Sequence, residues 1–356
     1  MDIRLNLTTT PKQKPTDETQ LGFGHLFTDH MFLMNYTEGQ GWHDARIEPY
    51  GPLSLDPASQ VLHYSQEIFE GLKCYRTEDD KFQLFRPREN FKRFNESAAR
   101  MGMATLDVDM ALEGLLKLLE VDKEWTPKAP DTSLYIRPTM IATDSYLGVG
   151  ASKTYLFFII LSPSGAYYSS GLSPVAIYVE ENYVRAVRGG VGFTKTGGNY
   201  AASILAGKKA KENGYAQVLW LDGVEQRYIE EVGAMNMMFV YENKKIVTPA
   251  LNGSILSGIT RKSVLELASN LGYETEEATL AIDDVIADCK SGKITEAFGS
   301  GTAAVISPVN LIAFKGERVT IGDGNTGKIT KELYDKLTGI QYGRIADENN
   351  WILPVK

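Results

Sequence analysis

One lysine in the middle of the chain has the surroundings of a lysine that binds a cofactor covalently. Lys195 lies among five glycines, namely Gly189, Gly190, Gly192, Gly197 and Gly198. Such a cluster indicates unusual backbone angles or close approach of the chain to a ligand. A helical pattern follows from 201 to 211, and its positive end disfavours a protonated amine by ~0.3–1 kcal/mol, so burial must supply the rest if Lys195 is to attack a carbonyl. The spacing alone also fits a surface lysine on a flexible loop.

Three features of the second half would complement this amine. Glu231 shares a face of an expected strand with Ile229, and a buried carboxylate there needs a cationic partner such as a protonated pyridine nitrogen. Ser257–Arg261, at an expected helix start with Ser257 as its cap, and Gly299–Ala303, after an expected strand, have the small residues of anion-binding loops. Each also has a plainer interpretation: a solvated strand end, a helix cap and a tight turn.

The first half supplies arginines and aromatic residues. Arg93 lies on an expected helix, and Arg137 lies within an expected strand, where a charge needs a partner. Aromatic residues near turns and strand ends are Phe23, Tyr64, Phe69, Tyr135 and Tyr167. These arginines could be structural ion-pair partners, and the aromatic residues could be core. Together with Lys195 and Glu231, however, they complete the components of a pyridoxal phosphate site: an amine, a carboxylate, two anion sites and an apolar wall.

Composition excludes several other classes of function. The net charge of −8 and the absence of a dense basic run argue against binding of nucleic acid. Cys74 and Cys289 lie far apart, so there is neither a disulfide framework nor a CxxC motif, and the histidines fall in the first fifth of the chain, so we expect no metal site. No apolar run reaches the ~18–20 residues of a membrane-spanning helix, and no signal peptide is evident, so we expect a cytoplasmic protein.

The patterns predict an α+β fold in about two domains, because strands adjoin strands as often as helices. We expect strands at 28–36, 60–67, 81–85, 133–137, 154–161, 175–180, 235–241, 245–248 and 294–298, and a hairpin at 217–231 around Asp222–Gly223. Helices are expected at 90–101, 109–121, 201–211, 257–271, 283–290 and 331–342. The expected organisation is a mobile lead-in at 1–20, a small domain at 21–163, a linker at 164–174 and a large cofactor-binding domain at 175–356.

Nine short motifs occur in one order along the chain. They are Phe69–Lys73, Leu84–Pro87, Ser133–Pro138, Gly189–Gly192, Lys195–Tyr200, Gln217–Leu221, Glu231–Asn236, Leu251–Gly258 and Phe298–Ala303. In this order they resemble the branched-chain amino acid aminotransferases, fold-type IV enzymes that depend on pyridoxal 5'-phosphate. The similarity runs from about Phe23 to the C-terminus and is closest to the long form of the family. It implies a smaller N-terminal mixed α/β domain, a larger C-terminal pseudo-barrel, and ping-pong transamination between leucine, isoleucine or valine and 2-oxoglutarate.

The resemblance also implies a role for each matching residue. Lys195 would be the Schiff-base lysine that shuttles the substrate proton, Glu231 would hold the pyridine nitrogen protonated, and Tyr200 would bind the phenolic oxygen. The phosphate would be held by Arg93, Arg185, the N–H groups of Ile259 and Thr260, and the turn from Ser300 to Thr302. The N–H groups of Thr302 and Ala303 would bind the substrate α-carboxylate.

The substrate side chain would lie between the aromatic residues Phe23, Tyr64, Phe69, Tyr135 and Tyr167, with Arg137 available for the γ-carboxylate of glutamate. In the family a loop of the partner subunit roofs this pocket. That loop is Leu147–Val149 here, so the resemblance implies a homodimer.

Two departures from the family pattern are visible. Ala304–Ser307 stands where mammalian members carry a redox CxxC, so we expect no thiol control there. Ala234 replaces a threonine of many relatives, from which we expect a change of rate or specificity.

Other classes of function fit less well. D-amino acid aminotransferase and aminodeoxychorismate lyase are shorter and lack the Phe69–Lys73 and Gly189–Gly192 motifs. Lys195 together with Glu231 argues against a catalytically silent binding protein. The glycines do not have the GxGxxG spacing of a nicotinamide oxidoreductase.

Overall fold

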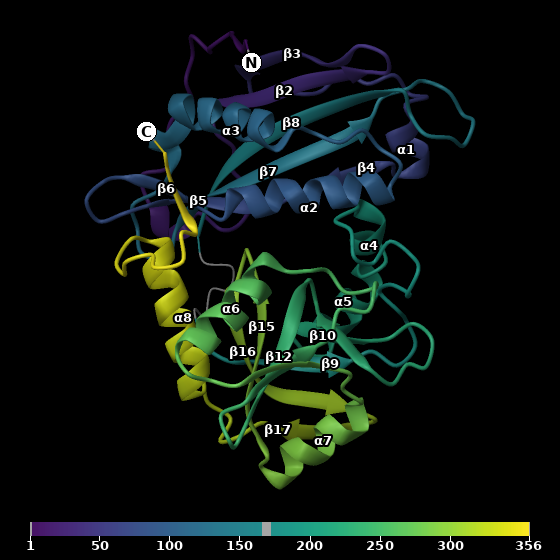
Figure 1. The fold of residues 1–356 in the computed structure, drawn as a ribbon, viewed down its shortest axis with the longest axis vertical. Helices are drawn as coiled ribbons and strands as arrows, with labels where there is room; N and C mark the ends of the chain where they lie inside the picture. The colour runs from purple at the N-terminus through teal and green to yellow at the C-terminus, as the bar shows by residue number, and fades with distance from the viewer. Residues whose placement is uncertain (1, 166–171, 356) are drawn as a thin grey trace. The chain divides into compact units, whose positions relative to one another are not determined.

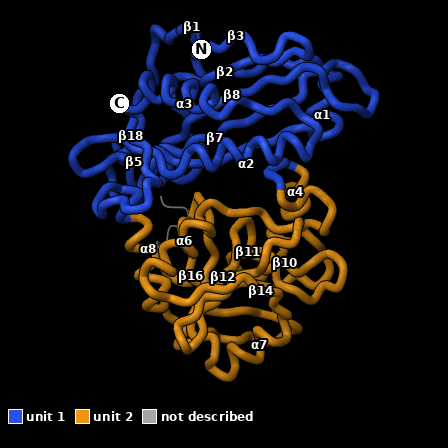
Figure 2. The backbone as a smooth tube through the Cα atoms, in the orientation of Figure 1, with its two compact units in different colours: residues 1–167, 194–197, 339–356 blue, residues 168–193, 198–338 orange. Residues whose placement is uncertain are grey.

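The computed structural model describes residues 2–165 and 172–355. The chain divides into two compact units (Figure 2): residues 1–167, 194–197 and 339–356 form unit 1, and residues 168–193 and 198–338 form unit 2. Lys195 therefore belongs to unit 1, although the residues on both sides of its tetrapeptide belong to unit 2. The expected linker at 164–174 falls largely outside the described residues and stays a prediction.

Unit 1 is built on a nine-stranded sheet. Its strands are β1 (Arg4–Leu5), β2 (His30–Thr37), β3 (Gly41–Pro49), β4 (Glu67–Phe69), β5 (Leu72–Arg76), β6 (Phe82–Phe85), β7 (Ser133–Ala142), β8 (Thr154–Ser164) and β18 (Ile352–Val355). The order is β1-β3-β2-β8-β7-β5-β6-β18, and β4 pairs with β7. The strand β18 thus completes a sheet whose other members all lie in the first half of the chain.

Helices α2 (Pro87–Arg100) and α3 (Val108–Asp122) cover one face of this sheet (Figure 1). Their apolar residues Phe91, Phe94 and Leu115 pack with Ile68 and Met140 of β4 and β7 in one core. Paired residues of an antiparallel sheet point to the same face and neighbours along a strand alternate. The opposite face of β4 and β7 is therefore free of these helices.

Residues 2–20, expected as a mobile lead-in, make several contacts with the rest of unit 1. Strand β1 pairs in parallel with β3. The backbone N–H of Thr8 donates to Nε2 of His30 (3.0 Å), and the N–H of Lys12 donates to Oδ1 of Asp29 (2.7 Å). Nδ1 of the same histidine lies 2.7 Å from Asp122 in α3, so this segment is tied to the helix layer as well.

Unit 2 is built around a closed ring of strands. Its strands are β9 (Val175–Val179), β10 (Gln217–Leu221), β11 (Ile229–Val232), β12 (Met235–Tyr241), β13 (Ile246–Pro249), β14 (Thr275–Ala278), β15 (Ile294–Gly301), β16 (Val305–Phe314) and β17 (Glu317–Thr320). The pairing runs β11-β10-β9-β16-β15-β12, and β12 also pairs with β11, which closes the ring. This ring confirms the expected pseudo-barrel.

Helices follow or flank the ring (Figure 1). They are α4 (Gly197–Ala201), α5 (Ile204–Glu212), α6 (Ile259–Asn270), α7 (Ile282–Ser291) and α8 (Lys328–Gln341). Ala206 and Ala210 of α5 pack on Val218 and Trp220 of β10, so the neighbours of Lys195 in sequence are anchored on a barrel strand.

Three expectations need correction, and one strand was not foreseen. The expected strand at 60–67 is instead helix α1 (Gln60–Tyr64) followed by the start of β4, because five residues are too few for periodicity to distinguish the two. The expected helix at 201–211 begins only at Ile204, as α5, and a separate short helix, α4, ends at Ala201. Helix α6 begins at Ile259 with Gly258 as the cap residue, so Ser257 is not the cap. The strand β3 was not expected, because its sequence mixes polar, charged and apolar residues and its strand conformation depends on pairing with its neighbours.

Candidate active site

Backbone hydrogen bonds hold Lys195 in unit 1. Its N–H donates to Oγ of Ser97 on α2 (3.0 Å), and its carbonyl accepts from the N–H of Phe69 on β4 (2.9 Å). The next two residues are held by one neighbour, since Oγ1 of Thr196 donates to the Glu67 carbonyl (2.8 Å) and the N–H of Gly197 donates to Oε1 of Glu67 (2.6 Å). The glycine-rich loop is thus fixed at the lysine.

The free face of β4 and β7 brings several expected substrate-pocket residues to Lys195. Its Nζ lies 5.0 Å from the ring centroid of Phe69. The guanidinium carbon of Arg137 lies 4.6 Å from the same ring, and Nη2 donates to the hydroxyl of Tyr135 (3.0 Å). Phe23 packs edge-on against Tyr135, with ring centroids 4.8 Å apart. Unit 1 therefore groups an amine, an arginine and three aromatic rings.

Two other pocket candidates of unit 1 belong to α1 and to the loop bound to it, and a third lies outside the described residues. Tyr64 is at the end of α1 and donates its hydroxyl to the carbonyl of Leu147. Val149 is 85% exposed in the same loop. Tyr167 is outside the described residues, so its role stays a prediction.

A buried ion pair lies next to this group. Nε and Nη2 of Arg93 donate to the two oxygens of Glu70 at 2.7 and 2.9 Å, and Nδ2 of Asn90 donates to Oε2 (2.8 Å). Burial alone would raise the pKa of Glu70, but the charge and hydrogen bonds of Arg93, the charge of Lys195 and the hydrogen bond from Asn90 together hold the pKa below its usual value. Glu70 therefore orients Arg93, which is the expected phosphate ligand, and adds negative charge near Lys195.

The carboxylate of Glu231 is held inside unit 2. Its Oε1 accepts from the N–H of Leu256 (2.7 Å), and Oε2 lies 3.3 Å from Nε of Arg185. Arg185 also donates to the carbonyl of Ser254. Arg185 is thus a direct partner of Glu231, in addition to the phosphate role that the resemblance implies.

Adjacent strands place the other unit 2 candidates in a row. Glu231 pairs with Asn236, and Asn236 pairs with Ser300. Nδ2 of Asn236 donates to the carbonyl of Leu256 (2.9 Å), and its Oδ1 would lie 2.0 Å from any Cβ at Gly258. A glycine is therefore needed there.

The loop that leads to α6 is thus held beside the carboxylate of Glu231. The first N–H groups of α6, at Ile259 and Thr260, have no hydrogen-bond partner within the helix. Ser300 is buried, and its Oγ has no hydrogen-bond partner among the described residues. Thr302 and Ala303 form the turn after β15, and Tyr200 lies on α4; all three are half-buried.

Sequence reasoning missed several residues of this arrangement. Strand β11 is buried on both faces, so Glu230 is buried as well as Glu231. Glu230 accepts from Nδ2 of Asn252 (3.0 Å) and from Oγ of Ser254, and thereby holds the start of the loop whose end Glu231 and Asn236 hold. The sequence offered one signal for Glu67, Glu70 and Asn236: each residue lies within or beside one of the motifs that carry the family resemblance.

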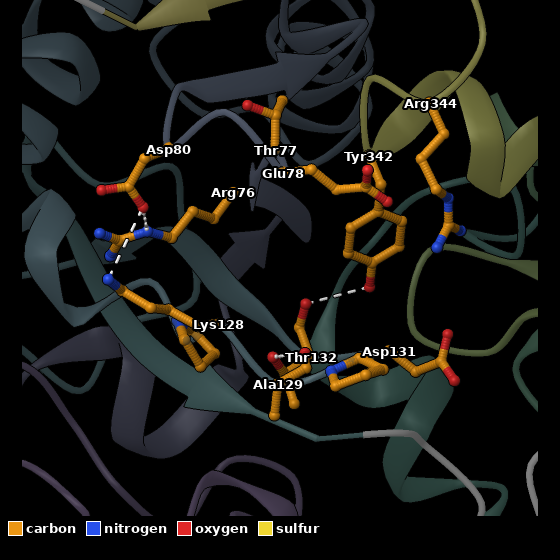
Figure 3. A pocket seen from close by; sticks show the side chains of 12 residues that line it. Arg76, Thr77, Glu78, Asp80, Lys128, Ala129, Asp131, Thr132, Tyr342 and Arg344 are labelled. Atoms are coloured by element: carbon orange, nitrogen blue, oxygen red, sulfur yellow. Dashed lines mark hydrogen bonds and ion pairs between the residues drawn. The ribbon is translucent and has the colours of Figure 1, made fainter.

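Unit 1 also contains a polar cavity of about 230 Å³ (Figure 3). Its lining includes Arg76, Lys128, Asp131, Tyr342 and Arg344, and none of the expected site residues. Arg76 and Lys128 both lie within ion-pair distance of Asp80 on one side of it, and the hydroxyl of Tyr342 donates to the carbonyl of Thr132 (3.0 Å). This cavity is separate from the grouping around Lys195.

Two further expectations concern absences. Across residues 2–165 and 172–355, no cluster of three or more His, Cys, Asp or Glu side chains could hold a metal ion. Over the same ranges no helix is long and apolar enough to cross a membrane.

Comparison with known proteins decides the family. Residues 67–312 match the model of the amino-transferase class IV family. The chain belongs to the class IV amino-transferases. This aminotransferase is 55% identical over 353 residues to branched-chain-amino-acid aminotransferase 2 of Bacillus subtilis, covering 99% of this chain and 97% of the relative.

Solved structures agree with that assignment. The branched-chain amino acid aminotransferase of Escherichia coli matches with a TM-score of 0.77 and 27% identity, covering 91% of this aminotransferase and 99% of the other chain. The T.th. branched-chain amino acid aminotransferase, solved with pyridoxamine 5'-phosphate, matches with a TM-score of 0.74 and 26% identity, covering 91% and 98%. The expected family and fold-type IV architecture are confirmed.

Proposed function

We propose that Lys195 is the lysine that binds the cofactor of this enzyme and moves the substrate proton, and that Glu231 holds the ring nitrogen protonated. The enzyme is an aminotransferase that acts on branched-chain amino acids, with pyridoxal 5'-phosphate as its cofactor. The observation that carries this activity is the 55% identity over nearly the whole chain to a branched-chain aminotransferase. When bound, the cofactor supplies an electron sink for the electrons of the substrate Cα–H bond.

The residues of unit 2 fit this cofactor chemically. A buried carboxylate such as Glu231 is stabilised by cations, and Arg185 and a protonated ring nitrogen would both serve. The buried hydroxyl of Ser300 has no hydrogen-bond partner among the described residues, as is also true of several other buried hydroxyls, and it would donate to a phosphate oxygen. The N–H groups of Ile259 and Thr260 at the start of α6 suit the same anion.

Other side chains would complete the cofactor site. Tyr200 would hydrogen-bond the phenolic oxygen, and Thr302 would contribute to the phosphate contacts. Arg93 would bind the phosphate while Glu70 orients its guanidinium group.

The substrate pocket must accept both leucine and glutamate. Phe23, Phe69 and Tyr135 supply an apolar wall, to which Tyr64 and Tyr167 would add. Arg137 stacks on Phe69 and is hydrogen-bonded to Tyr135, so its charge is partly satisfied when the substrate side chain is apolar. The N–H groups of Thr302 and Ala303 would bind the α-carboxylate common to both substrates.

A homodimer would cover an exposed apolar patch of unit 1. Leu62, Tyr146, Leu147 and Val149 are 58%, 41%, 65% and 85% exposed, and hydrogen bonds from Gln60 and Tyr64 tie the loop to α1. Patches of this kind mark interaction sites. In the proposed dimer, the loop Leu147–Val149 roofs the site of the partner subunit. We also propose a cytoplasmic location.

Replacement of Lys195 by alanine tests the proposal. Transamination of L-leucine with 2-oxoglutarate should fall to background, while the variant still binds pyridoxal phosphate by absorbance after gel filtration. The parent protein should show a near-visible band that is bleached by L-leucine and not by D-alanine. Near-normal turnover by Lys195→Ala would refute the assignment.

A further inference from the structure

One side chain that the family resemblance does not assign contacts the loop of Lys195 directly. Oε1 of Glu67 accepts from the N–H of Gly197 at 2.6 Å, and the Glu67 carbonyl accepts from Oγ1 of Thr196 at 2.8 Å. The Lys195 N–H donates to Ser97 and its carbonyl accepts from Phe69, so the backbone is held on both sides of the lysine. Glu67 binds both of the residues that follow Lys195.

The approach is close enough to constrain the sequence. A Cβ at position 197 would lie 2.0 Å from Oε1 of Glu67, so only glycine lets the carboxylate reach this N–H. The neighbouring Gly198 has no atom within 4 Å of its ideal Cβ position, so a contact of this kind is specific to Gly197. The contact thus explains one of the five glycines around Lys195.

Glu67 also lies on the face of the sheet that carries the pocket residues. It pairs with Ile141 of β7, and Phe69 pairs with Thr139, so both point to the same face as Arg137. Burial raises the pKa of Glu67, while the N–H of Gly197 and the charge of Arg137 oppose that shift. Desolvation of a carboxylate is unfavourable, so a half-buried carboxylate at this position indicates a role other than packing.

We infer that Glu67 is a positioning residue, which fixes the peptide between Thr196 and Gly197 and so directs the Lys195 amine over the Phe69 ring. The inference rests on the proposed role of Lys195. Without the acceptor, the start of α4 is free to shift and the amine leaves its position. A misplacement of about 1 Å in a catalytic group reduces turnover by about 100-fold.

Two variants of Glu67 separate the hydrogen bond from the charge. Glu67→Ala removes both, whereas Glu67→Gln keeps an oxygen that accepts from Gly197. Gln66→Ala is the matched control, because Gln66 is adjacent and its side chain also binds backbone groups, at Met101 and Ser152, but not the lysine loop. Each variant would be studied as the full-length enzyme loaded with pyridoxal phosphate.

We expect Glu67→Ala to lower kcat for L-leucine by about 100-fold, with KM changed less than about threefold. The pH midpoint of the cofactor's near-visible band should also shift, because the attached lysine is held differently. Glu67→Gln should keep kcat within about threefold and the same midpoint, and Gln66→Ala should change thermal stability alone. Equal kcat and midpoint in Glu67→Ala and Gln66→Ala would overturn the inference, as would a Glu67→Gln variant as impaired as Glu67→Ala.

A second route covers the case in which Glu67→Ala does not fold. Thr196→Val removes the hydrogen bond from Oγ1 of Thr196 to the Glu67 carbonyl. This variant should lower kcat by about tenfold and shift the pH midpoint of the near-visible band in the same direction as Glu67→Ala. An unchanged kcat and midpoint would count against the inference. The outcome for Lys195→Ala keeps the two proposals distinct. If that variant is inactive and the attachment variants are normal, only the role of Glu67 fails.

Discussion

Nε of Arg185 lies 3.3 Å from Oε2 of Glu231, and both side chains are more than nine-tenths buried. The pair forms within unit 2, from the segment before Lys195 and from a barrel strand. Desolvation of two charges is costly, and removal of one member leaves the other as an uncompensated buried charge. The other oxygen of Glu231 is fixed by the N–H of Leu256.

Glu231→Gln should therefore have two separable effects. We expect kcat for L-leucine to fall by roughly 10²–10³-fold, the loss typical of one preorganised electrostatic contact. The apoprotein should lose about 3–5 kcal/mol in its free energy of unfolding, because Arg185 is left buried without its partner. Urea denaturation and steady-state kinetics measure the two. The double variant with Arg185→Gln should regain stability but not activity; recovery of both would contradict the role of Glu231.

Arg137→Met should distinguish the two substrate classes. Methionine keeps an apolar contact with Phe69 but cannot bind a γ-carboxylate. Loss of a hydrogen bond to a charged group corresponds to about 10–100-fold in KM for glutamate and 2-oxoglutarate. The KM for leucine should stay within about threefold. Parallel losses for both substrates would show that Arg137 supports the pocket as a whole.

Both thiols should be inert in the native protein. Burial raises the pKa of Cys74 and of Cys289 to about 12, so about one thiol in 10⁴ is ionised at pH 8. A thiol reagent should label neither cysteine in the folded protein and both after denaturation. Because these folded-state pKa values are raised, their contribution to stability is complete below about pH 8.5 and declines as the pH rises toward 12. Thermal melts from pH 8 to 11 should show that decline, and a Cys74→Ala/Cys289→Ala variant should show less of it.

Two glycine-to-alanine changes should have opposite effects on stability. A Cβ at Gly114 in α3 would lie 2.7 Å from the buried Phe32 ring, so Gly114→Ala should destabilise by about 1–3 kcal/mol through overpacking. Gly207 in α5 has open space around its ideal Cβ position, so Gly207→Ala should stabilise by about 0.5–1 kcal/mol through helix propensity. Denaturant melts of Gly114→Ala test the packing of α3 against Phe32, and melts of Gly207→Ala test the open surface of α5.

Strong periodicity made much of the fold predictable. The expected helix at 109–121 corresponds to α3, and the expected strand at 154–161 corresponds to β8, with boundaries that differ by a few residues. The expected hairpin is the antiparallel pair of β10 and β11, but the carboxylate of Asp222 organises its turn by accepting four N–H groups, from Val224, Glu225, Arg227 and Tyr228. Short elements such as α1 carry too little pattern to be recognised.

Candidate site residues could be chosen where chemistry restricts residue type, and contacts could not be predicted where tertiary pairing decides. Residue type and pattern made Lys195 and Glu231 candidates, but their roles follow from the family resemblance and stay predictions. The bond between Glu67 and Gly197 joins residues 130 positions apart, and the pairing of Arg185 with Glu231 depends on where the loop before Lys195 runs. No local pattern encodes either contact.

The pairing of β18 with β6 has a consequence for how the protein is made. Residues 352–355 leave the ribosome after every other described strand, yet they cover the outer strand of the sheet in unit 1. Until β18 is synthesised, β6 is therefore an unpaired edge strand, and Phe82 and Leu84 lack their pairing partners in β18. The unit that begins to form first is the last to be completed, and this interval is when a nascent chain would most benefit from a chaperone.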